Sequence, residues 1–186
     1  MATEIEMRAR FDAATHDRLI AYLEQHGEDL GGDDKHIYFY VLPDKLLKVV
    51  DNLTAGTAKI SLKGSKIGQG AAFPELELPI RREDAGLAVR IFNALGLEGS
   101  MHDAFNRRRN FRYRGVEIAV KWSQAWGHHA EFEVLLDDMP TAAQQAEAVE
   151  RIRSVAEEVG VRLMSEQELA EFVRAFEEAQ AAKARG

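Results

Sequence analysis

The first ten residues alternate between apolar and charged side chains, and the next fifteen follow a different spacing. Ile5, Met7 and Ala9 share one side of the first stretch, and charged residues occupy the other. Side chains alternate across a strand, so this period predicts a β-strand. From Asp12 to His26 apolar residues recur at helical spacing, and Gly27 ends the pattern. A strand followed by an amphipathic helix is therefore expected at this end.

Short β-rich runs fill most of the remaining chain. Strands are predicted over His36–Leu42, Leu46–Asp51, Thr57–Gly64, Phe73–Ile80, Asp103–Tyr113, Val116–Ser123 and Ala130–Leu136. Helices are predicted over Ala85–Leu95 and Ala142–Val159, and a last helix begins after a capping Ser165. Most connections between strands have hairpin length, so the sheet should be largely antiparallel. We expect one α+β domain over 1–186, with the C-terminal helices of 143–186 packed on the sheet.

Composition and charge exclude several classes of protein. The 186 residues include no cysteine, which rules out disulfide scaffolds, zinc–thiolate sites and thiol nucleophiles. Net charge is −7, with 24 Lys and Arg against 31 Asp and Glu, which argues against a nucleic-acid partner held by phosphate neutralisation. No apolar run is long enough to span a membrane, and the first residues do not resemble a signal peptide. We expect a cytoplasmic protein without a membrane partner.

Pairs of like charges at strand spacing are the most unusual feature of the sequence. Glu-x-Glu occurs three times in the predicted strands, and basic residues also recur at strand spacing or stand alone among apolar neighbours, as Lys121 does. The acidic pairs are Glu4 and Glu6, Glu75 and Glu77, and Glu131 and Glu133. Residues i and i+2 point to the same face of a strand, so each pair places two carboxylates side by side. A solvated sheet face is one interpretation. A barrel with a polar lumen is the other, in which carboxylates bind Mg²⁺ or Mn²⁺ and basic residues bind phosphate.

The order of these motifs resembles the CYTH superfamily, the triphosphate tunnel metalloenzymes. Glu4-Ile5-Glu6-Met7-Arg8 is similar to the family's N-terminal Glu-x-Glu-x-Lys signature. Ile118–Ser123, Trp126-Gly127 and Glu131-Phe132-Glu133 resemble its closing hairpin. Lys63, the pair Glu75 and Glu77, and the run Arg107–Arg109 stand where the family has a lysine, an acidic pair and a basic strand. The resemblance covers roughly Glu4 to Ile152.

The resemblance implies an eight-stranded antiparallel tunnel that hydrolyses a small triphosphate with Mg²⁺ or Mn²⁺. Inorganic triphosphate, thiamine triphosphate and nucleoside triphosphates are the candidate substrates. The residues implied to be catalytic are Glu4, Glu6, Arg8, Glu131 and Glu133, and the four glutamates among them would hold the metal. The residues implied to bind substrate are Arg8, Lys48, Lys63, Glu75, Glu77, Arg107, Arg109 and Lys121.

Departures from the family pattern leave two alternative functions open. Val50 and Phe73 stand where arginines are expected, and Lys121 stands where an acidic residue is expected. The alternatives are an adenylyl cyclase of the class IV type and a catalytically silent module that binds polyphosphate or nucleotide. Lys121 is expected to face the lumen near Glu131 and Glu133, although an outer, solvated position is also compatible with the sequence.

Two further features carry weaker expectations. His128-His129 is predicted to lie in a turn rather than to form a metal site, because adjacent strand residues point apart. The last helix has an apolar stripe that would pack on the tunnel, cover one of its mouths or pair with a second copy of the chain. A homodimer is thus one candidate assembly.

Overall fold

The computed structural model describes residues 3–64, 72–73, 75–137 and 139–183. A single antiparallel sheet dominates this part of the chain. Its strands are β1 (Thr3–Arg10), β2 (Glu28–Gly32), β3 (Lys35–Val41), β4 (Leu46–Asn52), β5 (Thr57–Lys63), β6 (Ala72–Phe73), β7 (Glu75–Ile80), β8 (Met101–Tyr113), β9 (Val116–Ser123) and β10 (Gly127–Leu136). The helices are α1 (Ala13–His26), α2 (Ala85–Phe92), α3 (Ala142–Glu158) and α4 (Glu166–Lys183).

The predicted eight-stranded antiparallel sheet is confirmed, and two short strands are added to it. The order is β6-β1-β10-β9-β8-β3-β4-β5-β7, with β2 paired to β8. β6 and β7 are consecutive in the chain but pair with β1 and β5, so the sheet curls back on itself. The sequence did not indicate β2, because Glu28–Gly32 is rich in acidic residues and glycine, which are depleted in strands.

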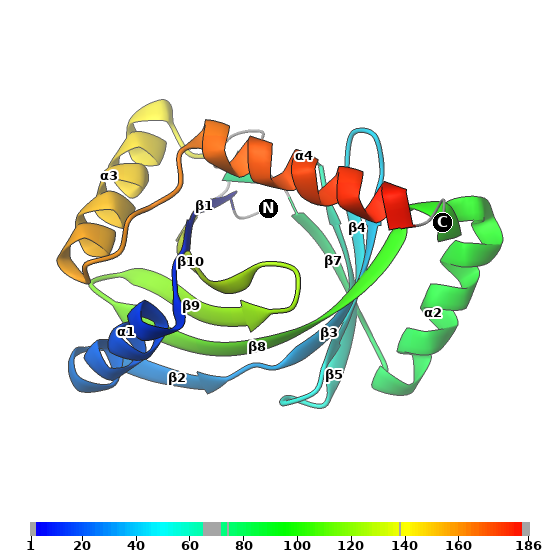
Figure 1. The fold of residues 1–186 in the computed structure, drawn as a ribbon, viewed down its shortest axis with the longest axis horizontal. Helices are drawn as coiled ribbons and strands as arrows, with labels where there is room; N and C mark the ends of the chain where they lie inside the picture. The colour runs from blue at the N-terminus through cyan, green and yellow to red at the C-terminus, as the bar shows by residue number, and fades with distance from the viewer. Residues whose placement is uncertain (1–2, 65–71, 74, 138, 184–186) are drawn as a thin grey trace.

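The main core lies on the convex side of the curled sheet. α1 and α3 cover β1, β10, β9 and β8 there, and α2 covers β4 on the other side of the molecule (Figure 1). Ile5, Phe111 and Phe132 are fully buried under these helices. Because strand side chains alternate, burying these residues on the convex side turns their neighbours Glu4, Glu6, Glu131 and Glu133 toward the concave side.

The C-terminal helices have different positions. Thr141 caps α3 through a capping box with Gln144, and Ser165 and Glu168 form the predicted capping box of α4. α3 packs on the convex core, whereas α4 crosses the open side of the curled sheet (Figure 1). No helix in the described ranges is both long enough and apolar enough to cross a membrane.

We expect Ile152→Ala to lower the free energy of unfolding by about 3 kcal/mol, because the truncation leaves a cavity between α3 and the sheet. Ile152 is fully buried in the main core. Arg153→Ala is the matched control on the same helix, since Arg153 is exposed and should change stability by less than about 0.5 kcal/mol. Urea unfolding followed by circular dichroism measures both. Equal effects would contradict the packing of α3.

Candidate functional site

The concave side of the sheet encloses a cavity of about 330 Å³ that is rich in charged side chains. All of the long strands contribute to its lining, and α4 closes its open side. Acidic and basic groups are nearly balanced. The charged lining residues are Glu4, Glu6, Arg8, Lys35, Lys48, Lys59, Lys63, Glu75, Glu77, Arg108, Lys121, Glu131 and Glu133. The polar lumen predicted from the sequence is therefore present.

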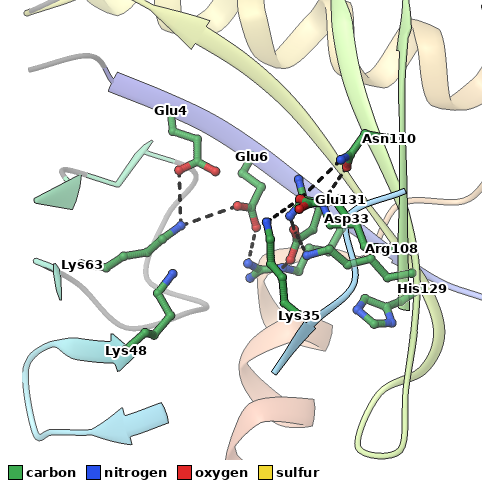
Figure 2. Close-up of polar contacts among 12 residues, drawn as sticks. Glu4, Glu6, Asp33, Lys35, Lys48, Lys63, Arg108, Asn110, His129 and Glu131 are labelled. Carbon is green, nitrogen blue, oxygen red and sulfur yellow. Dashed lines mark hydrogen bonds and ion pairs between the residues drawn. The ribbon is translucent and has the colours of Figure 1, made fainter. Parts of the chain in front are cut away.

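Lys63 joins the two ends of the curled sheet. Its Nζ lies 3.3 Å from Glu4 Oε2 and 3.8 Å from Glu6 Oε2 on β1 (Figure 2). It also lies 3.6 Å from Glu75 Oε2 on β7. Burial favours the neutral amine, but Glu6 and Glu4 outweigh it and raise the pKa of Lys63. Lys63 is therefore a fixed cation between strands that are far apart in the sequence.

Glu75 collects a second group of contacts at this end of the tunnel. Its Oε1 accepts from Lys48 Nζ at 3.2 Å and from the Ser61 hydroxyl. Burial opposes ionisation of Glu75, but Lys48 and Lys63 outweigh it and lower its pKa to about 2. Burial and the charge of Lys63 lower the pKa of Lys48. Glu75 is therefore a counter-charge for both lysines, although Lys63 also contacts Glu4 and Glu6.

Glu131 is surrounded by cations from three other strands. Arg8 Nε donates to Glu131 Oε1 at 3.2 Å, Lys121 Nζ contacts Oε2, and Arg108 Nη1 lies 3.9 Å from Oε2. Burial raises the pKa of Glu131, but Lys121 and Arg8 reverse this and hold it well below its usual range. Lys121 thus lies in the lumen, and the solvated position is excluded.

Glu6 and Glu133 have fewer cationic contacts. They are directly paired between β1 and β10. Burial raises the pKa of Glu6 to about 7, with Arg8 opposing and Glu131 adding to the rise. Burial, Glu6 and Glu131 also raise the pKa of Glu133. Oε1 of Glu6 lies beside the Arg8 guanidinium but accepts no hydrogen bond within the described residues. Glu6 and Glu133 thus lie close to other carboxylates and have fewer cations near them than Glu131 has.

A polar cluster that sequence reasoning missed lies where β2 meets β3. Asp33 binds the ammonium of Lys35, lies 3.6 Å from Arg108 Nε and accepts from Asn110 Nδ2 at 3.4 Å (Figure 2). Arg108 Nε also donates to Asn110 Oδ1 at 2.6 Å. Lys35 and Arg108 line the cavity, so Asp33 fixes two lumen cations. The spacing of the sequence gave no signal for this cluster.

The structure corrects the expectation for Arg107 and Arg109, which lie on the convex side. Arg109 forms ion pairs with Glu24 and Asp29, and Arg107 lies over the Trp122 ring at 5.8 Å. The reason is the phase of β8: Phe111 is fully buried in the convex core, and the preceding odd-numbered residues share its side. Arg108 faces the tunnel instead. The buried aromatic position was the signal that could have fixed this phase.

His128 and His129 belong to β10 rather than to a turn, which corrects another expectation. His129 lines the cavity, and its Nδ1 lies 2.9 Å from the carbonyl oxygen of Gly127. Burial and the charge of Lys121 lower the pKa of His129 to about 4. His129 is therefore neutral near pH 7. Glu77, by contrast, lies at the tunnel edge, where it is 43% exposed and pairs with Lys59.

One part of the lining is apolar. The strand register places Ile37 between Val50 and Ala104, and all three line the cavity. Val50 thus occupies a lumen position where the family pattern suggests arginine, whereas the Phe73 side chain lies outside the described part. α4 adds a second apolar group: Phe172 contacts Trp126 with ring centroids 4.6 Å apart, and Phe176 contacts His102 at 5.4 Å. The cavity can hold a ligand with both a charged and an apolar part.

The chemistry of the lining fits a hard divalent cation. Glu4, Glu6 and Glu133 supply only oxygen ligands, which Mg²⁺ and Mn²⁺ prefer. Glu6 and Glu133 are close enough to repel each other when ionised, and a bound cation would relieve this repulsion. Within the described ranges, no three acidic or histidine side chains are already gathered as a metal site. A cation would therefore have to draw these carboxylates together.

Comparison with solved structures finds the same fold. A protein from Pyrococcus horikoshii OT3 superposes with a TM-score of 0.68 at 20% identity over 90% of this chain and 97% of that one. A proposed adenylate cyclase from Vibrio parahaemolyticus gives 0.66 at 19% identity, over 90% and 97%. A proposed adenylyl cyclase from Hippeastrum, described as having a dominant triphosphatase activity, gives 0.59 at 16% identity, over 88% and 90%.

Sequence comparison adds no closer relative. No model of a protein family matches the chain, and no curated protein matches it. The likeness to these solved structures confirms the predicted fold. At these identities the comparison establishes the architecture, and the activity has to be argued from the side chains of the tunnel.

We expect Glu75→Gln to lower the free energy of unfolding by about 3 kcal/mol at pH 7, because it leaves Lys48 and Lys63 without a shared counter-charge. The pKa of Glu75 is lowered to about 2, so its contribution is complete above the ordinary value of 4.5 and is lost as the pH falls toward 2. The difference between the two proteins should therefore shrink below pH 4.5. Urea unfolding at pH 7, 5 and 3 measures it, and a difference independent of pH would contradict the prediction.

Proposed function

We propose that the tunnel binds a triphosphate and hydrolyses it with the help of Mg²⁺ or Mn²⁺. The observation that carries this proposal is the row of buried lysine and arginine side chains, each held by a carboxylate, inside a tunnel of this fold. A chain of phosphates is a small, highly charged anion that fits such a lining. Phosphoryl transfer depends mainly on positioning and on neutralising charge, which this lining supplies.

Phosphate binding is proposed as an exchange of partners. Lys63 and Lys48 contact Glu4 and Glu75 in the structure. A bound triphosphate would take over these ammonium groups and leave the carboxylates with uncompensated charge. Glu4, Glu6 and Glu133 would then hold the divalent cation, which when bound neutralises phosphoryl oxygens and polarises the phosphorus centre. Substrate and metal should therefore favour each other's binding.

Glu133 is the carboxylate proposed to orient the attacking water. Among the described residues it forms no ion pair, and burial together with Glu6 and Glu131 raises its pKa. A carboxylate in this state can accept a hydrogen bond, and then a proton, from water aimed at the terminal phosphorus. Arg8, held by Glu131, would contact the oxygens on which charge develops.

Cyclisation of ATP and binding without turnover are the alternative activities. Cyclisation uses the same carboxylates and basic residues, so the products separate it from hydrolysis. Cyclic AMP with pyrophosphate would indicate a cyclase, and ADP with phosphate would indicate a hydrolase. Calorimetry that shows tight binding of triphosphate with no product would indicate the silent module suggested by Val50, Phe73 and Lys121.

We expect the protein to release phosphate from at least one triphosphate in the presence of Mg²⁺ or Mn²⁺, and EDTA should abolish the release. Lys63→Met should lower kcat/KM roughly 100-fold, because it removes a buried phosphate contact. Lys59→Met is the matched control, since Lys59 is 37% exposed at the tunnel edge, and its effect should stay below about 3-fold. A colorimetric phosphate assay measures all three proteins. No release by the folded wild-type protein would overturn hydrolysis.

The apolar part of the lining favours a triphosphate that carries an organic group over inorganic triphosphate. Phe176→Ala should raise KM for ATP or thiamine triphosphate roughly 10-fold, because an aromatic contact is lost, and should leave KM for inorganic triphosphate unchanged. Phe105→Ala is the control, because Phe105 is exposed and is not part of the lining. Equal changes for all substrates would contradict a contact with the organic group.

A further inference from the structure

Glu131 differs from the other lumen carboxylates in the number of cations that it gathers. Arg8 from β1, Lys121 from β9 and Arg108 from β8 all approach its two oxygens. The strand register explains this convergence, because Arg8 is paired with Glu131 and Arg108 is paired with Lys121. The side chains of Arg8, Lys121 and Arg108 are 7%, 12% and 22% exposed, so the group is shielded from solvent.

Glu4, Glu6 and Glu133 form the contrasting group. Lys63 forms ion pairs with Glu4, Glu6 and Glu75. Arg8 forms ion pairs with both Glu6 and Glu131. Glu133 forms no ion pair in the described part of the chain. Among the described lumen carboxylates, Glu133 therefore has the fewest cationic contacts and Glu131 has the most.

We propose that Glu131 is a positioning residue that gathers Arg8, Lys121 and Arg108 into a phosphate-binding site, and that it is not a metal ligand. This assignment rests on the proposed function, in which a triphosphate occupies the tunnel. It departs from the role that the family resemblance implied for Glu131, and it includes Arg108, which the sequence did not single out.

The balance of contacts supports a phosphate at this position. Arg8, Lys121 and Arg108 meet at Glu131 in a shielded pocket, and although Arg8 also contacts Glu6 and Arg108 also contacts Asp33, a doubly charged terminal phosphoryl group would bring its oxygens to three cations at once. Each cation also keeps donors beyond those bound to Glu131, since lysine has three N–H groups and arginine has five. Asp33 holds Arg108 from its other side, and this fixes the guanidinium before any ligand arrives.

The same balance opposes a metal ion at Glu131. A divalent cation bound to this carboxylate would lie within a few ångströms of three positive groups, and their repulsion is strong where solvent is excluded. At Glu6 and Glu133 the same ion would instead relieve repulsion between carboxylates. Two neighbouring positions of the β1–β10 pair, Glu6 opposite Glu133 and Arg8 opposite Glu131, are thus suited to opposite charges.

Binding of Mn²⁺ alone, without triphosphate, tests the assignment. Electron paramagnetic resonance of free Mn²⁺ measures the affinity of the wild-type protein and of Glu131→Gln, Glu6→Gln and Glu133→Gln, which all make the same chemical change. We expect Glu6→Gln and Glu133→Gln to weaken binding at least 10-fold and Glu131→Gln to change it less than 2-fold. A loss in Glu131→Gln as large as that in Glu6→Gln would overturn the assignment.

A double-mutant cycle on triphosphate binding in EDTA tests the positioning role. Lys121→Met should weaken calorimetric binding of inorganic triphosphate at least 10-fold in the wild-type protein and less than 3-fold in Glu131→Gln, where the ammonium is no longer held. Equal losses in the two backgrounds would overturn positioning through Lys121. If Glu131→Gln does not fold, Glu131→Asp keeps the charge, and it should retain Mn²⁺ affinity while weakening triphosphate binding at least 5-fold.

The two experiments also separate this assignment from the proposed function. Absence of triphosphate binding by the folded wild-type protein would overturn both. Normal triphosphate binding together with a large loss of Mn²⁺ affinity in Glu131→Gln would overturn only the role of Glu131.

Discussion

Compensation of buried charge is the constraint on which the tunnel depends. An ionised side chain that leaves water loses several kcal/mol of solvation unless an opposite charge and hydrogen bonds replace it. The lumen satisfies this with ion pairs between strands, such as Arg8 with Glu131 on the paired strands β1 and β10, and Lys63 with Glu4 on β5 and β1. Because β1 and β5 do not pair, the contact of Lys63 forms only when the sheet is curled, and the apolar core on the convex side holds the curled sheet. The apolar core therefore keeps the sheet curled, and the curled sheet brings the charged groups of the lumen together.

Most of the fold could be predicted because strand alternation appears directly in the sequence. The order of the long strands and the helices follows from which residues are apolar, whereas the choice of a lumen over a solvated face for the Glu-x-Glu pairs came from the family resemblance. The same rule gave the wrong face for Arg107 and Arg109, because three consecutive arginines do not show which of them point into the lumen. The phase of β8 is set by Phe111, which is buried against the convex core. A charged run can be assigned to a face only from the apolar residues that flank it.

The rest of the site could not be predicted, because it depends on contacts between residues far apart in the chain. Asp33 reaches Arg108 across 75 positions through β2, a strand whose composition gave no signal. The strand register and the lengths of the side chains also decide which cation contacts which carboxylate. Lys121 was expected near Glu131 and Glu133, and the register of β9, β10 and β8 brings it to Glu131 and next to Arg108.

The uneven distribution of these pairs gives the tunnel a direction. Lys121, Arg8 and Arg108 share Glu131, whereas Glu6 and Glu133 have few cations near them. The separation lies along a single pair of strands, because β1 and β10 place Arg8 opposite Glu131 and Glu6 opposite Glu133. A chain of phosphates that enters such a lumen meets different partners at its two ends, so one orientation is favoured before any reaction begins. The apolar lining under α4 adds to this asymmetry, because an organic group can lie there only if the phosphates point toward the charged strands. The orientation of the proposed triphosphate would thus follow from the same register that makes the buried charges compatible with folding.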